Sequence, residues 1–434
     1  MRLGLIFSTL SPKDCDLLQT CRRYHKVEKV SSNPSYRWVI LGLGFFIYFN
    51  MGLVSAVLSA IVTPVMNDLN MTYSQMGFIL GTWQLVYIFV ALPLGFLTDR
   101  IGPYKSLLLA SIIVSLSAVL RAFAVNFETL ALFVAVFGVG GSLVSIGLPK
   151  LVSVWFLGGE RGMATGVNST GSMMGSIVAL SLTNSVIMPL VGNWRNAFLV
   201  YGSVGFLITA VWLFVGRRTP SMNEPEAAVA PVEREGLAGA KEVYKSKNVW
   251  LIVIIGVTSF LSSHGLANWL PTILQLKGMT PDLAGFSTAI LNVFAILGCF
   301  LIPRLSQIMG SKKSTISVLL FVQGLAILAI GMADGPILWT ALALDGVIKG
   351  GYMPLLIVIL MEMPEVGAKR MGIVGGLYFA VGEIGGFGGP FILGLLRDTT
   401  GLFLSGIVFL AVVCEAMIVL AFLLKVETQS AQVN

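Results

Sequence analysis

Long apolar runs recur along the whole chain, and they limit the fold more than any other feature. A transmembrane helix needs about 20 apolar residues, and twelve runs are long enough. Inside hydrocarbon every backbone N–H and C=O must be bonded internally, so we predict that each run is a helix. The runs occupy residues 38–60, 76–97, 106–125, 129–156, 161–189, 195–216, 249–275, 282–305, 314–333, 337–362, 367–395 and 402–424.

Composition supports a membrane protein and argues against several other classes. The chain is 56% hydrophobic and 11% charged, whereas soluble domains carry about 25% charged residues. Its formal charge of +7 comes from basic residues between the apolar runs, which argues against nucleic-acid binding. The 4 cysteines and 2 histidines have no metal-binding or redox spacing. We therefore expect an all-α membrane protein with no cofactor and no metal.

The runs fall into two groups of six. Residues 217–248 between the groups are charged and contain proline, so we interpret 38–216 and 249–424 as two six-helix halves joined by a linker. Lysine and arginine concentrate in the loops on the linker side, and such residues mark the cytoplasmic side of a membrane protein. We predict that the linker and the tails at 1–37 and 425–434 are all cytoplasmic.

The two halves resemble each other in sequence. Met71–Lys105 aligns without a gap with Met279–Lys313, at an offset of 208, and eight positions are identical. Parallel duplication of this kind is typical of transporters whose two halves surround a central site. The second copy has lost the acid, because Asp99 aligns with Gln307.

The loop between the second and third runs reads Gly-Phe-Leu-Thr-Asp-Arg-Ile-Gly-Pro-Tyr-Lys. It resembles the loop motif of the major facilitator superfamily, and Gly95, Asp99, Arg100, Gly102 and Lys105 match that motif. The resemblance implies a fold of twelve helices in two pseudo-symmetric halves that work by alternating access. It also implies a cytoplasmic gate, in which Asp99 interacts with the positive N-terminal end of a neighbouring helix in one state only.

Two further stretches carry a narrower resemblance. Asn268-Trp269-Leu270-Pro271 and Gly351-Tyr352-Met353-Pro354 are similar to segments of the cyanate and nitroimidazole permease family. That resemblance implies a small anion or a small polar organic compound as the substrate.

Charged residues inside the predicted helices are the best markers of function, because a charge at a helix centre costs roughly 2.5–3.5 kcal/mol on insertion scales. Asp345 and Lys349 lie one turn apart on one helix face. Lys349 could attract an anion and Asp345 could carry a proton, or the two could form a structural ion pair. Glu383, flanked by Gly382 and Gly385, could carry a proton, pair with Lys349, or bond to nearby backbone.

Several uncharged or titratable polar residues also lie within the runs. Each could contact a substrate, and each could instead bridge helices or fill a packing position. The candidates for substrate binding besides Asp345 and Lys349 are Tyr48, Asn50, Gln84, His264, Asn268 and Asn292. Arg121, Lys150 and Glu415 weigh less, since Arg121 and Lys150 lie near helix ends, where long side chains reach the interface.

We therefore predict a monomeric secondary transporter in the plasma membrane, surrounded by lipid. It would move a small anion or polar organic solute, by proton-coupled symport or by exchange. An exporter of apolar drugs with the same fold is the main alternative, given the many phenylalanines and methionines. A non-transporting sensor is a second alternative. The sequence has no nucleophile beside a base, so we do not expect catalytic residues or an enzyme.

Overall fold

The computed structural model describes residues 36–156, 160–216, 243–363 and 365–424. The predicted tails lie outside these residues, apart from the first two residues of α2, and so does most of the predicted linker. The division into two halves and two tails stays a prediction for those parts of the chain. The described residues are helical almost throughout.

Within each half the helices follow one another with short connections. The first half contains α2 (Tyr36–Ala60), α3 (Val62–Leu69), α4 (Tyr73–Arg121), α5 (Phe127–Trp155), α6 (Glu160–Leu182), a π-helical turn (Thr183–Ile187), α7 (Met188–Val191) and α8 (Trp194–Gly216). The second half contains α10 (Lys247–Leu276), α11 (Pro281–Met309), α12 (Lys312–Met332), α13 (Gly335–Glu362), α14 (Gly367–Thr400) and α15 (Phe403–Leu423).

In the described part of the chain, 11 helical stretches are long and apolar enough to cross a membrane. The longest of them, α4, provides two of the predicted spans, because its backbone leaves the helical region at Gly102 with φ 82° and ψ 163°. Glycine adopts such a positive φ without steric cost. The predicted all-α membrane fold with twelve spans is therefore confirmed.

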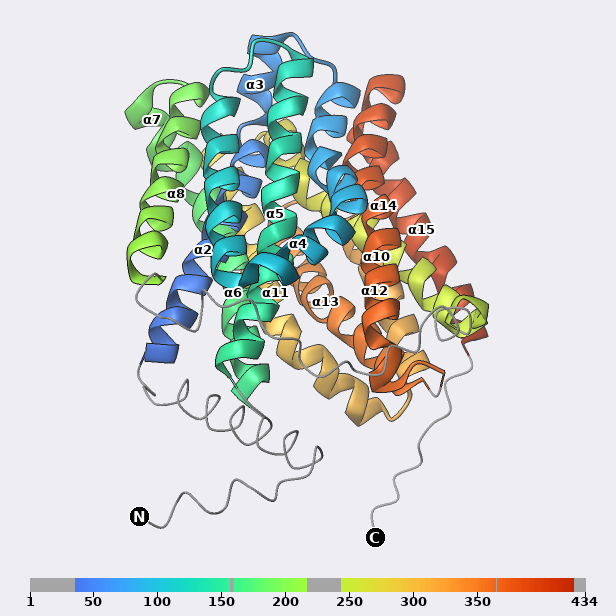
Figure 1. The fold of residues 1–434 in the computed structure, drawn as a ribbon. Coiled ribbons are helices and arrows are strands. Elements are labelled where there is room, and N and C mark those ends of the chain that lie inside the picture. Colours follow the sequence, from blue (N-terminus) through green and yellow to red (C-terminus); the bar gives the residue numbers. More distant parts are fainter. Residues whose placement is uncertain (1–35, 157–159, 217–242, 364, 425–434) are drawn as a thin grey trace, which may run out of the picture.

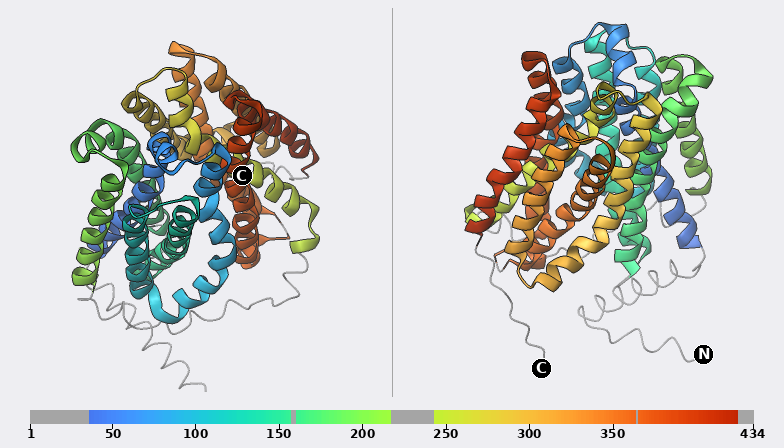
Figure 2. Two further views of the ribbon diagram at one scale, coloured as in Figure 1. Left: turned by 90° about the horizontal axis from the view of Figure 1, so that it is seen from above. Right: turned by 180° about the vertical axis from the view of Figure 1, so that it is seen from behind.

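The helices form a bundle with two distinct ends. Figure 1 shows α3 and α7 at one end, which we call the α3 end. The opposite end, where α2 begins and α15 ends, we call the base. Seen from above in Figure 2, the helices of the first half (blue to green) and those of the second half (yellow to red) form two neighbouring groups.

The two halves touch backbone to backbone toward the α3 end. A Cβ atom at Gly77 of α4 would lie 2.4 Å from the carbonyl oxygen of Pro390 on α14, and one at Gly81 would lie 2.7 Å from that of Phe387. The pseudo-equivalent contact brings Gly285 of α11 against α6, where an added Cβ atom would lie 2.2 Å from the carbonyl oxygen of Leu180. Small residues are required wherever helices approach so closely.

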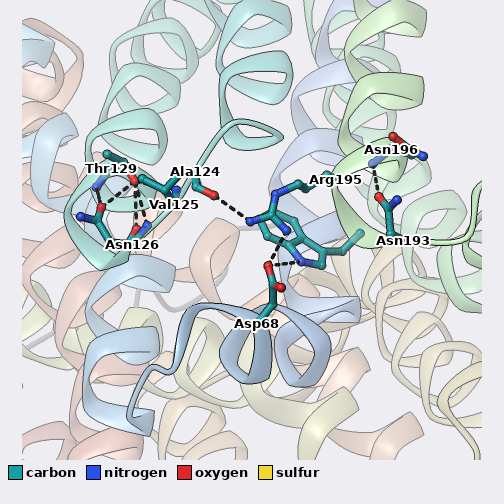
Figure 3. A network of polar contacts seen from close by, with 9 residues as sticks. Asp68, Ala124, Val125, Asn126, Thr129, Asn193, Arg195 and Asn196 are labelled. Carbon is teal, nitrogen blue, oxygen red and sulfur yellow. Dashed lines mark hydrogen bonds and ion pairs between the residues drawn. The ribbon is translucent and has the colours of Figure 1, made fainter.

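A polar network fixes α3 to its own half (Figure 3). The carboxylate of Asp68 accepts hydrogen bonds from the Arg195 guanidinium and from Nε1 of Trp194, the latter at 3.2 Å. Arg195 also donates to the backbone oxygen of Ala124, at 3.1 Å. The hydrogen bond from Arg195 is the main reason why the pKa of Asp68 lies below its usual value. The network joins α3, the end of α4 and the start of α8.

We expect the replacement Asp68→Asn to lower the melting temperature slightly at neutral pH. Because the folded pKa of Asp68 is lowered, its stabilising effect is present above its ordinary pKa and is lost as the pH falls through the lowered value. The difference between Asp68→Asn and the parent should therefore shrink in acid, as measured by thermal unfolding across pH. In an Arg195→Gln background the same replacement should have little effect, and a full effect there would contradict the pairing.

Candidate functional site

A cavity of about 500 Å³ lies between the two halves. Helices α2, α4, α5 and α6 line it from the first half, and α10, α11, α13 and α14 line it from the second. Its wall runs from Ser59 and Asn268 toward the α3 end to Pro149 and Met353 toward the base. A cavity of this size and position is suited to a small molecule at the repeat interface.

Most of the polar residues that the sequence singles out reach this cavity. The predicted residues that line it are Tyr48, His264, Asn268, Asn292, Lys349 and Glu383. Asn50 does not line it, because its amide lies 3.4 Å from the hydroxyl of Ser115 within the first half and is 1% exposed. Gln84 is completely buried beside the wall.

Asp345 and Lys349 share α13 but face different surroundings. Lys349 lines the cavity, and it is the only lysine or arginine among the described residues of the wall. Asp345 is 3% exposed, and its Oδ1 accepts a hydrogen bond from Nε2 of Gln323 on α12, at 3.5 Å. In the described residues no ion pair within 4 Å joins Asp345 to Lys349. The structure thus puts the cation at the cavity and the acid behind it.

Among the lining residues that the structure describes, Glu383 is the only acid, and it lies in a cluster that joins the halves. It is 5% exposed and comes from α14. Beside it, Nε2 of Gln84 on α4 is 3.2 Å from Nδ1 of His264 on α10. The ring of Trp83 meets the His264 ring edge to face, with centroids 5.8 Å apart. No three metal-binding side chains gather in the part of the chain that the structure describes.

Sequence reasoning missed a group of serines on the first-half side of the cavity. These residues are Ser55 and Ser59 on α2, Ser145 on α5, and Ser172 and Ser176 on α6. The hydroxyl of Ser59 donates to Oδ1 of Asn268 across the halves, at 2.8 Å. The spacing of four residues within each helical pair is the signal that could have identified them, because it puts both hydroxyls on one face.

Another expectation was wrong. Arg121 does not extend to the interface, because its side chain is only 2% exposed. Its guanidinium donates to the backbone oxygen of Val54 at 3.1 Å and lies over the rings of Phe137 and Phe198. Arg121 therefore ties together four helices inside the first half.

The motif loop turns at the base. Lys150 of α5 donates to Oδ1 of Asp99 at 2.8 Å, so Asp99 is paired within its own half in this structure. Gly102 provides the turn, as described above. Arg100 and Lys105 are exposed, and the space beside Gly95 is open.

The hydrogen bonds between described residues of the two halves lie at the α3 end or at mid-depth. The strongest set involves Asp398 at the end of α14, whose carboxylate accepts from the backbone N–H groups of Tyr73 and Ser74, at 3.1 and 2.7 Å. Asp398 therefore caps the first turn of α4, where the helix dipole favours a negative charge. Asn184 of the π-helical turn adds a bond to the carbonyl of Pro281, at 3.3 Å.

The comparison with known families identifies the protein class. The Major Facilitator Superfamily profile matches residues 41–390. The chain belongs to the Major Facilitator Superfamily. A solved chain, titled as a bacterial homolog of the human lysosomal transporter Spinster in an inward-facing and unoccupied conformation, shares the fold with a TM-score of 0.72 and 18% identity, covering 90% of this chain and 95% of that one.

Several relatives that match over most of the chain are named as transporters. One from Cupriavidus necator, "Probable sulfoacetate transporter SauU", is 25% identical over 84% of this chain and 88% of its own length. The "Quinolone resistance transporter" of Acinetobacter baumannii is 24% identical, over 81% and 86%. The "D-galactonate transporter" of Escherichia coli is 22% identical, over 80% and 86%.

We expect the replacement Asp398→Ala to weaken closure at the α3 end. Loss of a helix cap costs about 1 kcal/mol, which corresponds to about a fivefold fall in the ratio of closed to open molecules. Electron–electron distance measurements between spin labels at Leu190 and Leu402, in a cysteine-free background, would report this ratio; we call these labels the reporter pair. Both positions are exposed near the α3 end.

Asp334→Ala provides the matched control. Asp334 is an exposed carboxylate at the same end, and it pairs with Lys277 of its own half at 3.2 Å. Its loss should leave the reporter distances unchanged. Equal effects of the two replacements would show that the Asp398 cap has no special role.

Proposed function

We propose that this protein is a secondary transporter that carries a small organic anion through the cavity between its halves by alternating access. The halves rock about the cavity, so that it opens first at one end and then at the other. A ligand drives such a cycle only through different affinities for the two states. The substrate, protons or both must therefore bind one state better than the other.

The single observation that carries the anion proposal is the position of Lys349. It is the only lysine or arginine in the cavity wall, and it lies in the same wall as the amide side chain of Asn292. An ammonium group and an amide can both donate hydrogen bonds to a carboxylate or sulfonate. The names of two relatives, a sulfoacetate and a D-galactonate transporter, support the same substrate class.

Glu383 is the residue that we propose as the proton carrier. Burial disfavours the charged form of a carboxyl group, and Glu383 can exchange protons with solvent through the cavity that it lines. Asp345 is the other sequence candidate for this role, but its carboxylate faces Gln323 instead of the cavity.

Orientation follows from the distribution of basic residues. We propose that the base faces the cytoplasm, with both termini on that side, and that the protein spans the plasma membrane as a monomer. The structure, bonded across the halves toward the α3 end, then corresponds to an inward-facing state. The comparisons do not support the narrower resemblance to cyanate and nitroimidazole permeases, because the relatives that support the anion class are named for sulfoacetate and D-galactonate.

A drug exporter is the competing function. The cavity wall includes the aromatic residues Trp83, Phe260 and Phe379, and one relative is named for quinolone resistance. Reconstituted vesicles would distinguish the two. Uptake of sulfoacetate or D-galactonate, driven by a proton gradient, supports the anion transporter, whereas competition by quinolones or hydrophobic cations without anion uptake supports the exporter.

We expect Lys349→Ala to reduce anion binding at least about tenfold, equivalent to about 1.4 kcal/mol, because the cavity loses its only cation. Anion uptake into vesicles should fall accordingly or be lost. Lys349→Arg should retain part of the uptake. Lys245→Ala, which removes an exposed lysine near the base, is the matched control and should behave as the parent; normal transport by Lys349→Ala would contradict the proposed anion site.

The motif loop generates a separate prediction. Asp99→Asn should slow turnover several-fold and leave substrate affinity close to normal, because Asp99 lies at the base and is not among the residues that line the cavity. The measurement is the initial uptake rate together with equilibrium binding. Glu362→Gln is the control, since Glu362 is an exposed acid that pairs with Lys312 inside the second half. Unchanged turnover in Asp99→Asn would count against a gating role.

A further inference from the structure

Two buried oxygen atoms near the cavity have no hydrogen-bond donor. They are Oε2 of Glu383 and Oε1 of Gln84. A carboxylate oxygen and an amide oxygen can only accept hydrogen bonds. A buried polar atom left without a partner costs about 1–3 kcal/mol, so the pair needs an explanation.

The side chains that carry these two atoms converge over one glycine. A Cβ atom at Gly386 would lie 2.3 Å from Oε2 of Glu383, 3.0 Å from Cγ of Gln84 and 3.4 Å from Cδ2 of His264. Glycine at this position leaves the space in which they meet. Gln84 belongs to the first half, whereas Glu383 and His264 belong to the second.

We propose that Glu383 carries a proton in this state and shares it with Gln84, so that one proton joins the two halves. The carboxyl O–H of Glu383 donates to Oε1 of Gln84, and Nε2 of Gln84 donates to Nδ1 of His264. One added proton thereby satisfies both acceptors and completes a chain of two hydrogen bonds across the interface. The inference rests on the proposed transport by alternating access and names the partner of its proton.

The other polar groups around Glu383 do not replace Gln84 as the partner of its proton. Lys349 on α13 and Tyr87 on α4 line the same cavity, and in the described residues no ion pair joins Lys349 to Glu383. His264 on α10 already contacts Gln84. On α2 the titratable group that lines the cavity is Tyr48, which bonds to Ser145.

The charged groups on the remaining neighbours are directed elsewhere. Glu415 of α15 lies against Gly324 of α12, and Asp345 of α13 faces Gln323. Neither carboxylate has a contact with Glu383. The proton is therefore the donor that is missing between Glu383 and Gln84.

A second acid–amide pair shows why the position across the halves matters. Asp345 and Gln323 have the same chemistry, but both belong to the second half and move together. A proton bound there does not distinguish the two states. A proton on Glu383 does, because separation of the halves removes Gln84 and raises the free energy of the protonated form relative to the closed state.

The test measures the ratio of closed to open molecules as a function of pH. It uses the distance between the spin labels of the reporter pair, with the protein in detergent or nanodiscs and without substrate. In the parent, the ratio of closed to open molecules at the α3 end should rise as the pH falls from about 8.5 to about 5.5, by at most about tenfold per pH unit for one proton. Glu383→Gln should be closed at every pH, because its amide N–H₂ donates permanently to Gln84. Gln84→Leu should be more open and insensitive to pH.

Two further variants guard against misfolding and against a different proton site. In the swap Gln84→Glu with Glu383→Gln, the acid moves to the other half, and the pH response should return. In Asp345→Asn, the response should match the parent. Loss of the response in Asp345→Asn but not in Glu383→Gln would overturn the proposal and place the proton at Asp345.

Other outcomes would also overturn it. A parent whose ratio of closed to open molecules falls as the pH falls would show that the Gln84 amide is turned and donates to a charged Glu383. A pH-independent parent, or a Glu383→Gln variant with the parent's response, would show that no proton on Glu383 joins the halves. This experiment can fail independently of the proposed transport function, because the spin labels report the conformation of the protein without substrate. An intact pH response with no anion uptake contradicts the proposed substrate, whereas normal uptake with no response contradicts the shared proton.

Discussion

The bilayer core contains no water to bond to a free peptide group, and every other feature of this protein depends on that constraint. It forces the backbone of each span into a helix, so that the spans differ from one another mainly in their side chains. The break from helical geometry inside α4, at Gly102, lies in the loop between two spans. Selectivity and motion must therefore arise at the contacts between helices, which is where the cavity and the cross-half bonds lie.

Those contacts are unevenly distributed, and the imbalance defines the state that the structure represents. Glycines bring α4 against α14 and α6 against α11 toward the α3 end, and Asp398 caps α4 at the same end. At the base, Asp99 bonds to Lys150 inside its own half. Two acids thus stand at opposite ends of the molecule, one bonded across the halves and the other paired within its own half.

The fold could be predicted from the sequence because run length, loop charge and the internal repeat are all properties of sequence order. The site was predicted only in part, because helix rotation is set by packing. Asp345 and Lys349 are one turn apart, yet a turn of four residues advances by about 40° beyond a full circle, enough to direct one to α12 and the other to the cavity. The serines gave only a weak signal, since a hydroxyl in a membrane helix costs little. The prediction that Arg121 reaches the interface was wrong, because its position near a helix end does not reveal the aromatic rings that enclose it.

The π-helical turn at Thr183–Ile187 has a consequence for the symmetry of the two halves. A π turn accommodates one extra residue, so it rotates everything beyond it by about a quarter of a turn relative to a regular helix. Its counterpart α14 is helical from Gly367 to Thr400 without such a turn. The internal repeat is therefore broken at the α3 end: α14 keeps one helical screw, whereas the first-half helix changes its screw at Asn184, the residue that donates to the carbonyl of Pro281 in the opposite half.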